Sequence, residues 1–285
     1  FNLSRRDNPV QILEVIPKYS GMSFHKDGGA GSQIPRITVL CRDLKTGKIG
    51  YFHVDRYFRG TDDFGHLNVW SNINTLEVGN VITPDLVLST SPAHKGPAYC
   101  LGVNANTVYM TLPEGIEDAM LISRSLAKKM TSTQISRVVI NVKPDSRILN
   151  IYGDEDDYRI LPIIGEKIRD DGILFASRPT SCMTYAADVD PESLTKIRDM
   201  QDTLYTVKKN GIVVDLEFFV NRQRASNHPY TQIDAYQRAT EEYWRKIIDG
   251  YRKHCKVPNP PEITNELNNL VNTAMIRLLA MGASV

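Results

Sequence analysis

The chain has 285 residues, of which 41% are hydrophobic and 24% are charged; these values are ordinary for a globular protein and argue against wholesale disorder. Lys and Arg together number 34 and Asp and Glu 33, which argues against a chain that holds duplex DNA alone through an overall basic excess. Any nucleic-acid contact must then be local or shared with other chains. No apolar run approaches the ~20 residues that a membrane-spanning helix needs, so no membrane partner is expected.

The N-terminal part of the sequence is typical of short β-strands. Three segments, VQILEVI at residues 10–16, RITVLCRD at 36–43 and KIGYFHVDRYF at 48–58, alternate in polarity or are rich in β-branched and aromatic residues. The tetrapeptide Lys-Thr-Gly-Lys at residues 45–48 predicts a hairpin turn between the second and third segments. The Gly- and Ser-rich stretch at residues 18–36 predicts a connection rather than a phosphate-binding loop.

A helical period begins at residues 117–130, EDAMLISRSLAKKM. Acidic residues open this segment and lysines close it, as the helix macrodipole favours. The apolar residues that would share its buried side are Met120, Leu121 and Leu126. The next segment, SRVVINVKP at residues 136–144, predicts a return to strand, and residues 145–179 predict turn-rich β structure.

The C-terminal part predicts a β-hairpin followed by two long helices. Residues 204–223, LYTVKKNGIVVDLEFFVNRQ, form two strand-like halves around a Lys-Asn-Gly turn signal at 209–211. Residues 231–253 and 263–281 carry apolar side chains at spacings of three and four, and the prolines of KVPNPPE between them cannot continue a helix. The apolar stripe predicted for the second helix consists of Leu267, Leu270, Ala274, Leu278 and Met281. We therefore expect an antiparallel helical pair.

The adjacent carboxylates Glu117 and Asp118 are the one local feature that suggests chemistry. They follow the strand-like NTVYMTL and a Pro-Glu-Gly turn, and they open the predicted helix. At such a turn they could bind Mg²⁺, directly or through water. The helix dipole alone also favours acidic residues in a first turn. No Walker, zinc-protease or nucleophile motif accompanies them, and the four cysteines contain no C-x-x-C pair.

One stretch resembles a known family. Residues 80–129, NVITPDLVLSTSPAHKGPAYCLGVNANTVYMTLPEGIEDAMLISRSLAKK, are similar to part of the β subunit of multisubunit DNA-dependent RNA polymerases. Leu-Gly-Val-Asn at 101–104 falls on the family's "L-G-x-N", and Glu117-Asp118 falls on the pair in "G-Y-N-F-E-D-S-I-L-V-S-E". The sequence DYRILPIIGEKIRDDGIL at 157–174 resembles the family's next block, "D-I-P-N-V-G-E … D-E-x-G-I-I". The agreement covers about a third of the chain.

This sequence departs from the family pattern at several points. The family's Phe before the acidic pair is Ile116, the preceding loop is one residue shorter, and the turn residues Tyr and Asn are absent. The basic, Gly-rich block that carries the family's two nucleotide-binding lysines has no match before Val285. A divided chain of this kind is similar to the split β subunits of large (jumbo) bacteriophages.

The resemblance implies a fold and a domain division. Residues 1–185 would be a β-rich core containing an incomplete double-psi β-barrel with the Glu-Asp turn. Residues 186–285 would be a flap-like hairpin followed by the two amphipathic helices. The expected fold class is therefore α+β and mainly β, and another polypeptide would have to complete the barrel.

The resemblance also implies an activity. The family transcribes DNA into RNA by two-metal nucleotidyl transfer, and its main aspartate triad belongs to the β′-type subunit. Glu117 and Asp118 would support the reaction near a nucleotide-bound Mg²⁺, through water. The expected partners are β′-type chains, the remaining β portion, template DNA, RNA transcript and nucleoside triphosphates, but the isolated chain would be inactive. The expected location is the host cytoplasm of an infected bacterium, with packaging in the virion left open.

The first C-terminal helix is unusually aromatic. Its aromatic residues are Tyr236, Tyr243, Trp244 and Tyr251. They would either pack against the second helix and the hairpin or form a contact for a partner such as an initiation factor. Two other readings of the whole chain stay open: a non-catalytic nucleic-acid-binding or assembly subunit that keeps the polymerase fold, and a virion structural protein with a chance match.

Overall fold

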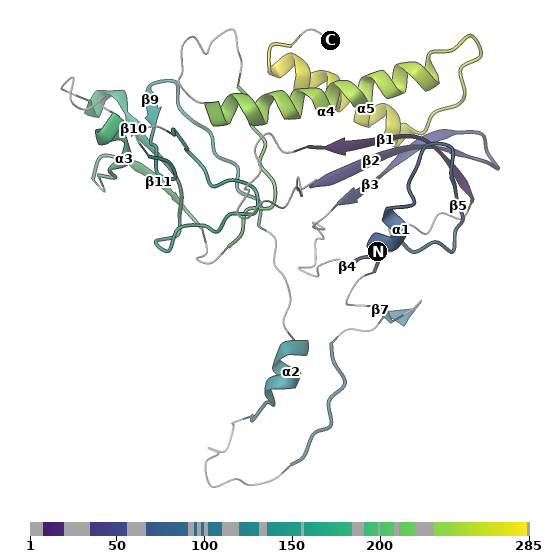
Figure 1. Cartoon of the computed structure of the whole chain (residues 1–285), viewed down its shortest axis with the longest axis horizontal. Coiled ribbons are helices and arrows are strands. Elements are labelled where there is room, and N and C mark those ends of the chain that lie inside the picture. The colour runs from purple at the N-terminus through teal and green to yellow at the C-terminus, as the bar shows by residue number, and fades with distance from the viewer. Residues whose placement is uncertain are drawn as a thin grey trace.

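A computed structural model describes residues 8–19, 35–55, 67–90, 94–95, 98–99, 102–109, 120–130, 136–154, 157–183, 191–198, 200–207, 211–220 and 231–283. These residues form an α+β fold in which a curled antiparallel sheet and a C-terminal helical pair lie together, with a smaller sheet beside them (Figure 1). The expected α+β class and helical pair are confirmed. A double-psi barrel is not established by these elements.

The larger sheet has four antiparallel strands in the order β3-β2-β1-β5. They are β1 Val10–Lys18, β2 Arg36–Asp43, β3 Ile49–Asp55 and β5 Val81–Ile82. The predicted turn after β2 is present: the Asp43 carboxylate accepts hydrogen bonds from the backbone of Lys45 and Thr46, at 2.8 and 2.9 Å. Gly47 then takes a φ of 72°, which costs glycine little because it lacks a Cβ.

Both faces of this sheet are buried, because successive side chains of a strand point to opposite faces. Val39 and Cys41 face a cluster that includes Ile73 and Leu88. Leu40, between them, faces the helical pair. The central strand β2 therefore has four consecutive buried residues, and the sheet forms the middle layer of this half of the molecule.

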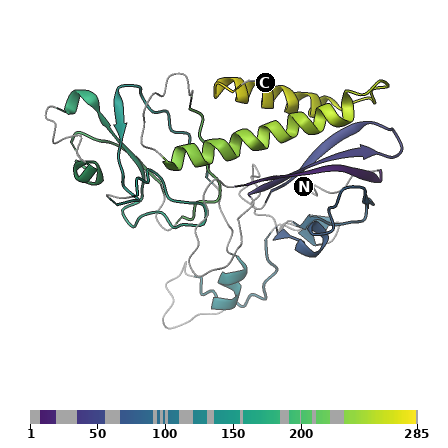
Figure 2. The same ribbon diagram turned by 45° about the horizontal axis from the view of Figure 1, so that its top comes forward.

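The helical pair consists of α4 Thr231–Cys255 and α5 Asn265–Ala280. The two helices run antiparallel side by side (Figure 1 and Figure 2). All five apolar positions predicted for the second helix are buried: Leu267, Leu270, Ala274, Leu278 and Met281. Helix α4 also comes very close to the sheet, because a Cβ built on Gly250 would lie 2.9 Å from the Leu40 side chain.

The smaller sheet has the order β11-β10-β9, with β9 Ser146–Ile148, β10 Ile173–Pro179 and β11 Thr203–Thr206. The N-terminal turns of α4 attach to the residues around it. The side chain of Gln232 accepts hydrogen bonds from the backbone N–H groups of Ile160 and Leu161 and donates one to the Leu161 carbonyl. Helix α4 thus contacts both sheets.

The predicted hairpin at residues 204–223 does not form as expected. Its first half, β11, pairs with β10 instead. Its second half bridges to the chain near residue 166: the Val213 N–H donates to the Glu166 carbonyl, and the Val213 carbonyl accepts from the Gly165 N–H. The turn at 208–210 lies outside the described residues. Strand β10 is long enough to pair with the first half, so the two halves of the predicted hairpin have different neighbours. The residues of the turn alone cannot predict this.

The remaining elements outside the site are short. They are β4 Leu67–Asn68, α1 Trp70–Ile73, β6 Ser89–Thr90, β7 His94–Lys95, β8 Ala98–Tyr99, the 3₁₀ turn η1 Thr180–Cys182 and α3 Pro191–Thr195. The smaller sheet takes strands from both sides of the predicted boundary at 185/186, so the division into two domains stays a prediction.

Candidate functional site

Glu117 and Asp118 lie outside the described residues, but the chain on either side of them is described. We call these flanking residues, 102–109, 120–130 and 136–143, the arm. Its one helix, α2 Arg124–Lys129, lies away from both sheets and from the helical pair in two views (Figure 1 and Figure 2). The Ser123 hydroxyl caps α2 by accepting a hydrogen bond from the Leu126 backbone, at 3.2 Å.

Large apolar side chains of the arm are exposed. Tyr109 is fully exposed, Met120 is 88% exposed and Val108 is 79% exposed. Other exposed apolar residues of the arm are Val103, Leu121, Ile122, Met130, Val138, Val139 and Val142. Single exposed apolar residues are normal, so it is their number within three short ranges that distinguishes the arm from the rest of the described chain.

Two local predictions for the arm are wrong. The helix is described only from Arg124, so Met120 and Leu121 precede it, and both are exposed rather than buried. Residues 136–143 form no strand in this structure, although their sequence alternates. Both predictions fail for the same physical reason: a buried helix face or a paired strand needs a neighbouring segment. No described segment of this chain packs along the arm except near its base, where Ile140 contacts the smaller sheet.

The aromatic residues of α4 pack inside the chain. Tyr236, Tyr243 and Trp244 are 1%, 2% and 6% exposed, and burial raises the pKa of Tyr236 to about 12. Tyr251 is partly buried against the same core. Of the two alternatives for these rings, packing therefore applies to the first three. The larger sheet and α5 cover Tyr243 and Trp244, whereas Ile163, Ile164 and Phe218 pack around Tyr236.

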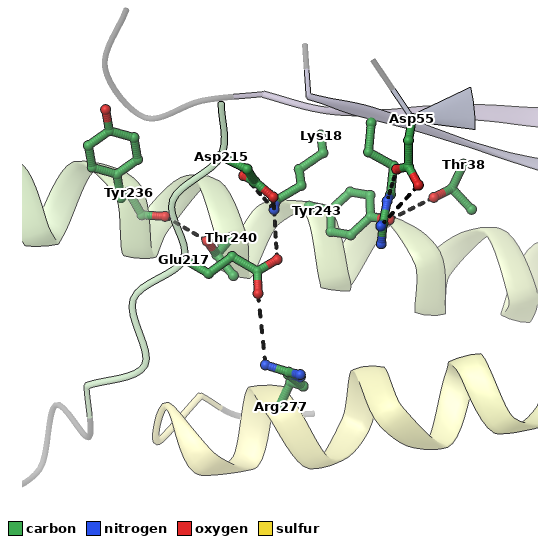
Figure 3. A network of polar contacts seen from close by, with 10 residues as sticks. Lys18, Thr38, Asp55, Asp215, Glu217, Tyr236, Thr240, Tyr243 and Arg277 are labelled. Carbon is green, nitrogen blue, oxygen red and sulfur yellow. Dashed lines mark hydrogen bonds and ion pairs between the residues drawn. The ribbon is translucent and has the colours of Figure 1, made fainter. Parts of the chain in front are cut away.

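A buried polar network connects β1, residues 211–220 and α5 (Figure 3). We call residues 211–220 the connecting segment, because they run from the smaller sheet toward α4. The Lys18 ammonium lies 2.9 Å from Asp215 and 2.6 Å from Glu217, and its side chain is 4% exposed. Glu217 also faces Arg277 of α5 at 3.9 Å.

Electrostatics holds the connecting segment in place. Burial tends to raise the pKa of Glu217, but the charge and hydrogen bond of Lys18, together with the charges of Arg277 and Arg36, outweigh burial and the net shift is downward. The Arg277 guanidinium lies 4.5 Å from the centre of the Phe219 ring, and the Gln237 side chain donates to the Val220 carbonyl at 2.7 Å. Beyond its bridge at Ile212, this extended segment is thus fixed by side chains of three elements.

A second set of polar contacts lies along the same side of α4. The Tyr243 hydroxyl is 2.6 Å from the Thr38 hydroxyl, which is 2.9 Å from His53 Nδ1. Burial lowers the pKa of His53 to about 4, and the nearby Arg36 charge acts in the same direction. His53 is therefore neutral at physiological pH. The Thr38–Tyr243 hydrogen bond of this set joins the larger sheet to α4 (Figure 3).

Sequence reasoning missed the Lys18 network entirely. From the sequence alone, we expect a lysine at a strand end and two acidic residues in a predicted hairpin to be exposed. No local pattern signals their meeting, because Lys18 and Asp215 are 197 positions apart.

Within the described ranges, no three His, Cys, Asp or Glu side chains come together in a way that could hold a metal ion. None of the helices in those ranges is long and apolar enough to cross a bilayer. A scan of protein-family models and a search of curated proteins found no match to this chain.

Proposed function

We propose that this chain is part of the β-type subunit of a multisubunit DNA-dependent RNA polymerase. It would act in complex with β′-type chains and the remaining β portion, on template DNA, RNA transcript and nucleoside triphosphates. The support from sequence is the order of the motifs between residues 80 and 174. The proposed location is the host cytoplasm of an infected bacterium or the phage particle.

The observation that carries the proposal is the exposed arm. It contains residues 102–109 and 120–129 of the stretch that resembles the polymerase family, and in that family the corresponding stretch is part of a double-psi β-barrel. Burying one large apolar side chain contributes about 1.5–3 kcal/mol, so the exposed residues of the arm leave a large stabilisation to be gained from a companion. An unpaired, alternating segment such as residues 136–143 also suits strand addition by another chain.

The proposed mechanism gives Glu117 and Asp118 a supporting role. One or two carboxylates, completed by water and substrate phosphates, are the usual protein contribution to a magnesium site, so the acidic pair fits Mg²⁺ chemically. Magnesium would stabilise the negative charge of the triphosphate. The two carboxylates would orient water around that charge, while the companion β′-type chain would supply the principal aspartates.

Replacing the acidic pair tests the mechanism. In the reconstituted complex, Glu117→Ala with Asp118→Ala should slow nucleotide addition on a preformed scaffold by about tenfold or more, equivalent to at least ~1.4 kcal/mol of barrier. Assembly of the complex should be unchanged, and higher Mg²⁺ should recover part of the rate.

The matched control removes two exposed carboxylates elsewhere, Glu77→Ala with Asp85→Ala, and should leave the rate unchanged. Equal rates for the two double variants across a range of Mg²⁺ would remove the acidic pair from the mechanism. They would favour the alternative of a non-catalytic assembly or nucleic-acid-binding subunit.

A further inference from the structure

One nucleophilic side chain is enclosed by carboxylates and has no part in the proposed chemistry. The Lys18 side chain is 4% exposed, and its Nζ lies 3.0 and 2.9 Å from the two carboxylate oxygens of Asp215. An oxygen of Glu217 is closer still, at 2.6 Å (Figure 3). Asp215 and Glu217 are two positions apart in the extended connecting segment, so their side chains point to the same side. An amine and two carboxyl groups therefore share one site.

Burial changes the balance between an ion pair and an amide. In water, an amine and a carboxylic acid stay apart as ions because hydration stabilises both charges. The Lys18 ammonium has lost nearly all of that hydration, and the Asp215 side chain is only 16% exposed. An amide has no charge, so removing it from water costs less than removing two ions. The site therefore favours an amide more than water does.

The fold also holds the two groups in contact. Strand β1 is paired with β2 along its length, and the Arg277 and Gln237 side chains fix the end of the connecting segment. Because Nζ is almost equally far from both oxygens of Asp215, it lies next to the carboxyl carbon, Cγ, that joins them. Well-oriented groups within one molecule reach effective concentrations of about 10⁵–10⁸ M. A condensation that is too slow between free molecules then becomes accessible within one chain.

We propose that Lys18 and Asp215 condense into an isopeptide bond, with Glu217 as the group that moves the protons. Glu217 accepts a proton from the Lys18 ammonium, and the freed lone pair attacks Cγ of Asp215. The Nζ–Cγ bond forms and one Cγ–Oδ bond breaks. The released oxygen leaves as water with the two protons that the nitrogen loses, and Glu217 ends in its original ionised form. An ammonium and a carboxylate contain all the atoms of one amide and one water, so no other reactant is needed.

The contacts, which are those of the groups before the bond forms, distinguish the reacting carboxyl group from the proton carrier. Asp215 presents both oxygens to Nζ, whereas Glu217 presents one and directs the other toward Arg277, at 3.9 Å. The Arg277 charge favours the ionised form of Glu217, which is the form that accepts a proton. The Asp215 side chain is also the less exposed of the two, 16% against 27%, so replacing its charge by an amide relieves more desolvation.

Intact-mass spectrometry of the purified full chain, denatured before injection, tests the bond. The mass should be lower than that of the sequence by one water molecule. Tryptic digestion should then give a branched peptide in which Lys18 is joined to Asp215 and the chain is uncut after Lys18. Lys196 is the internal control: it contacts Glu192 at the same 2.6 Å, but both side chains are exposed, so their peptides should remain unbranched.

Two variants separate the charge of Lys18 from its chemistry. Lys18→Arg keeps a cation between the carboxylates, but a guanidinium does not lose its proton in proteins, so this variant should have the full mass of its sequence. Glu217→Gln keeps the shape of the side chain but cannot accept the proton, and it should lower the fraction of condensed chain at least about tenfold. Circular dichroism should show that both variants fold like the unchanged chain.

An unchanged chain with the full sequence mass and no branched peptide would overturn the inference and leave the Lys18 network as an ion pair only. A Lys18→Arg chain that also lacks one water would place the loss elsewhere, and equal condensation in the Glu217→Gln variant would overturn the role of Glu217. The inference does not depend on the proposed function, because the masses are measured on the chain alone and no outcome changes the elongation rates expected for the acidic-pair variants.

Discussion

At the scale of single residues, the most informative feature of the structure is a buried lysine. Lys18 ends β1 in a position where its ammonium has almost no contact with solvent, and two carboxylates replace the lost hydration. A buried charge with one missing partner is costly, because the remaining charges keep their desolvation without compensation. The connecting segment is therefore attached to the sheet by charge, although neighbouring Leu216 and Phe218 also pack into apolar clusters.

Replacing Lys18 by Met should lower the free energy of unfolding by about 2–4 kcal/mol, because Asp215 and Glu217 would lose the cation that contacts both of them. Urea denaturation followed by circular dichroism measures this. Lys48→Met breaks an exposed pair with Glu262 and should cost less than about 1 kcal/mol. Similar losses for the two variants would mean that Lys18 contributes no more than a surface ion pair.

At the scale of elements, α4 holds the two sheets together. Its first turns bind the chain beside the smaller sheet through Gln232, and its second half packs on the larger sheet and on α5. Gly250 lies where α4 passes close to the larger sheet. Glycine has a lower helical propensity than most other residues, but a larger side chain at this position would press against Leu40. This element accounts for a large part of the hydrophobic core.

Truncating Ile247, which is 0% exposed on α4, to Ala should destabilise the protein by about 2–5 kcal/mol, because a cavity would open between helix and sheet. Ile276→Ala on α5 is the matched control: its side chain is 68% exposed, and the expected change is within about 0.5 kcal/mol. Thermal or urea unfolding distinguishes the two. An Ile247 variant as stable as the Ile276 variant would contradict this packing of α4.

At the scale of the whole molecule, a packed body contrasts with an arm that packs little. Both faces of the larger sheet are covered, while the arm exposes many apolar side chains. Under the proposed function this contrast is expected, because the segment that covers the arm would belong to another polypeptide.

Affinity purification of the chain from its native source, followed by mass spectrometry, should recover large companion subunits, including one with the polymerase aspartate triad and one with the basic, Gly-rich lysine block. Their hydrophobic contact with the arm should persist at high salt, because apolar burial is not screened by ions. A Tyr109→Ser, Val108→Ser variant should recover less of them. Purification of the unchanged chain without large companions would favour a virion structural protein.

The two ends of the chain show how far sequence reasoning reaches. The alternation of polar and apolar residues predicted β1, β2 and β3, and the Lys-Thr-Gly-Lys turn predicted the connection between β2 and β3. Spacings of three and four predicted α4 and α5 with the correct buried side chains. These successes share a cause: each depends on residues within a few positions of one another, so the sequence alone carries the information.

Tertiary structure decided what depends on distant partners. The halves of the predicted hairpin pair with segments other than each other, Lys18 is buried by carboxylates 197 and 199 positions away, and the arm lacks the neighbour that its apolar pattern requires. Periodicity shows that a side chain or strand needs a partner, but not which segment provides it. That choice follows from burial and charge neutralisation across the folded chain, and under the proposed function the choice of partner for the arm would extend to another molecule.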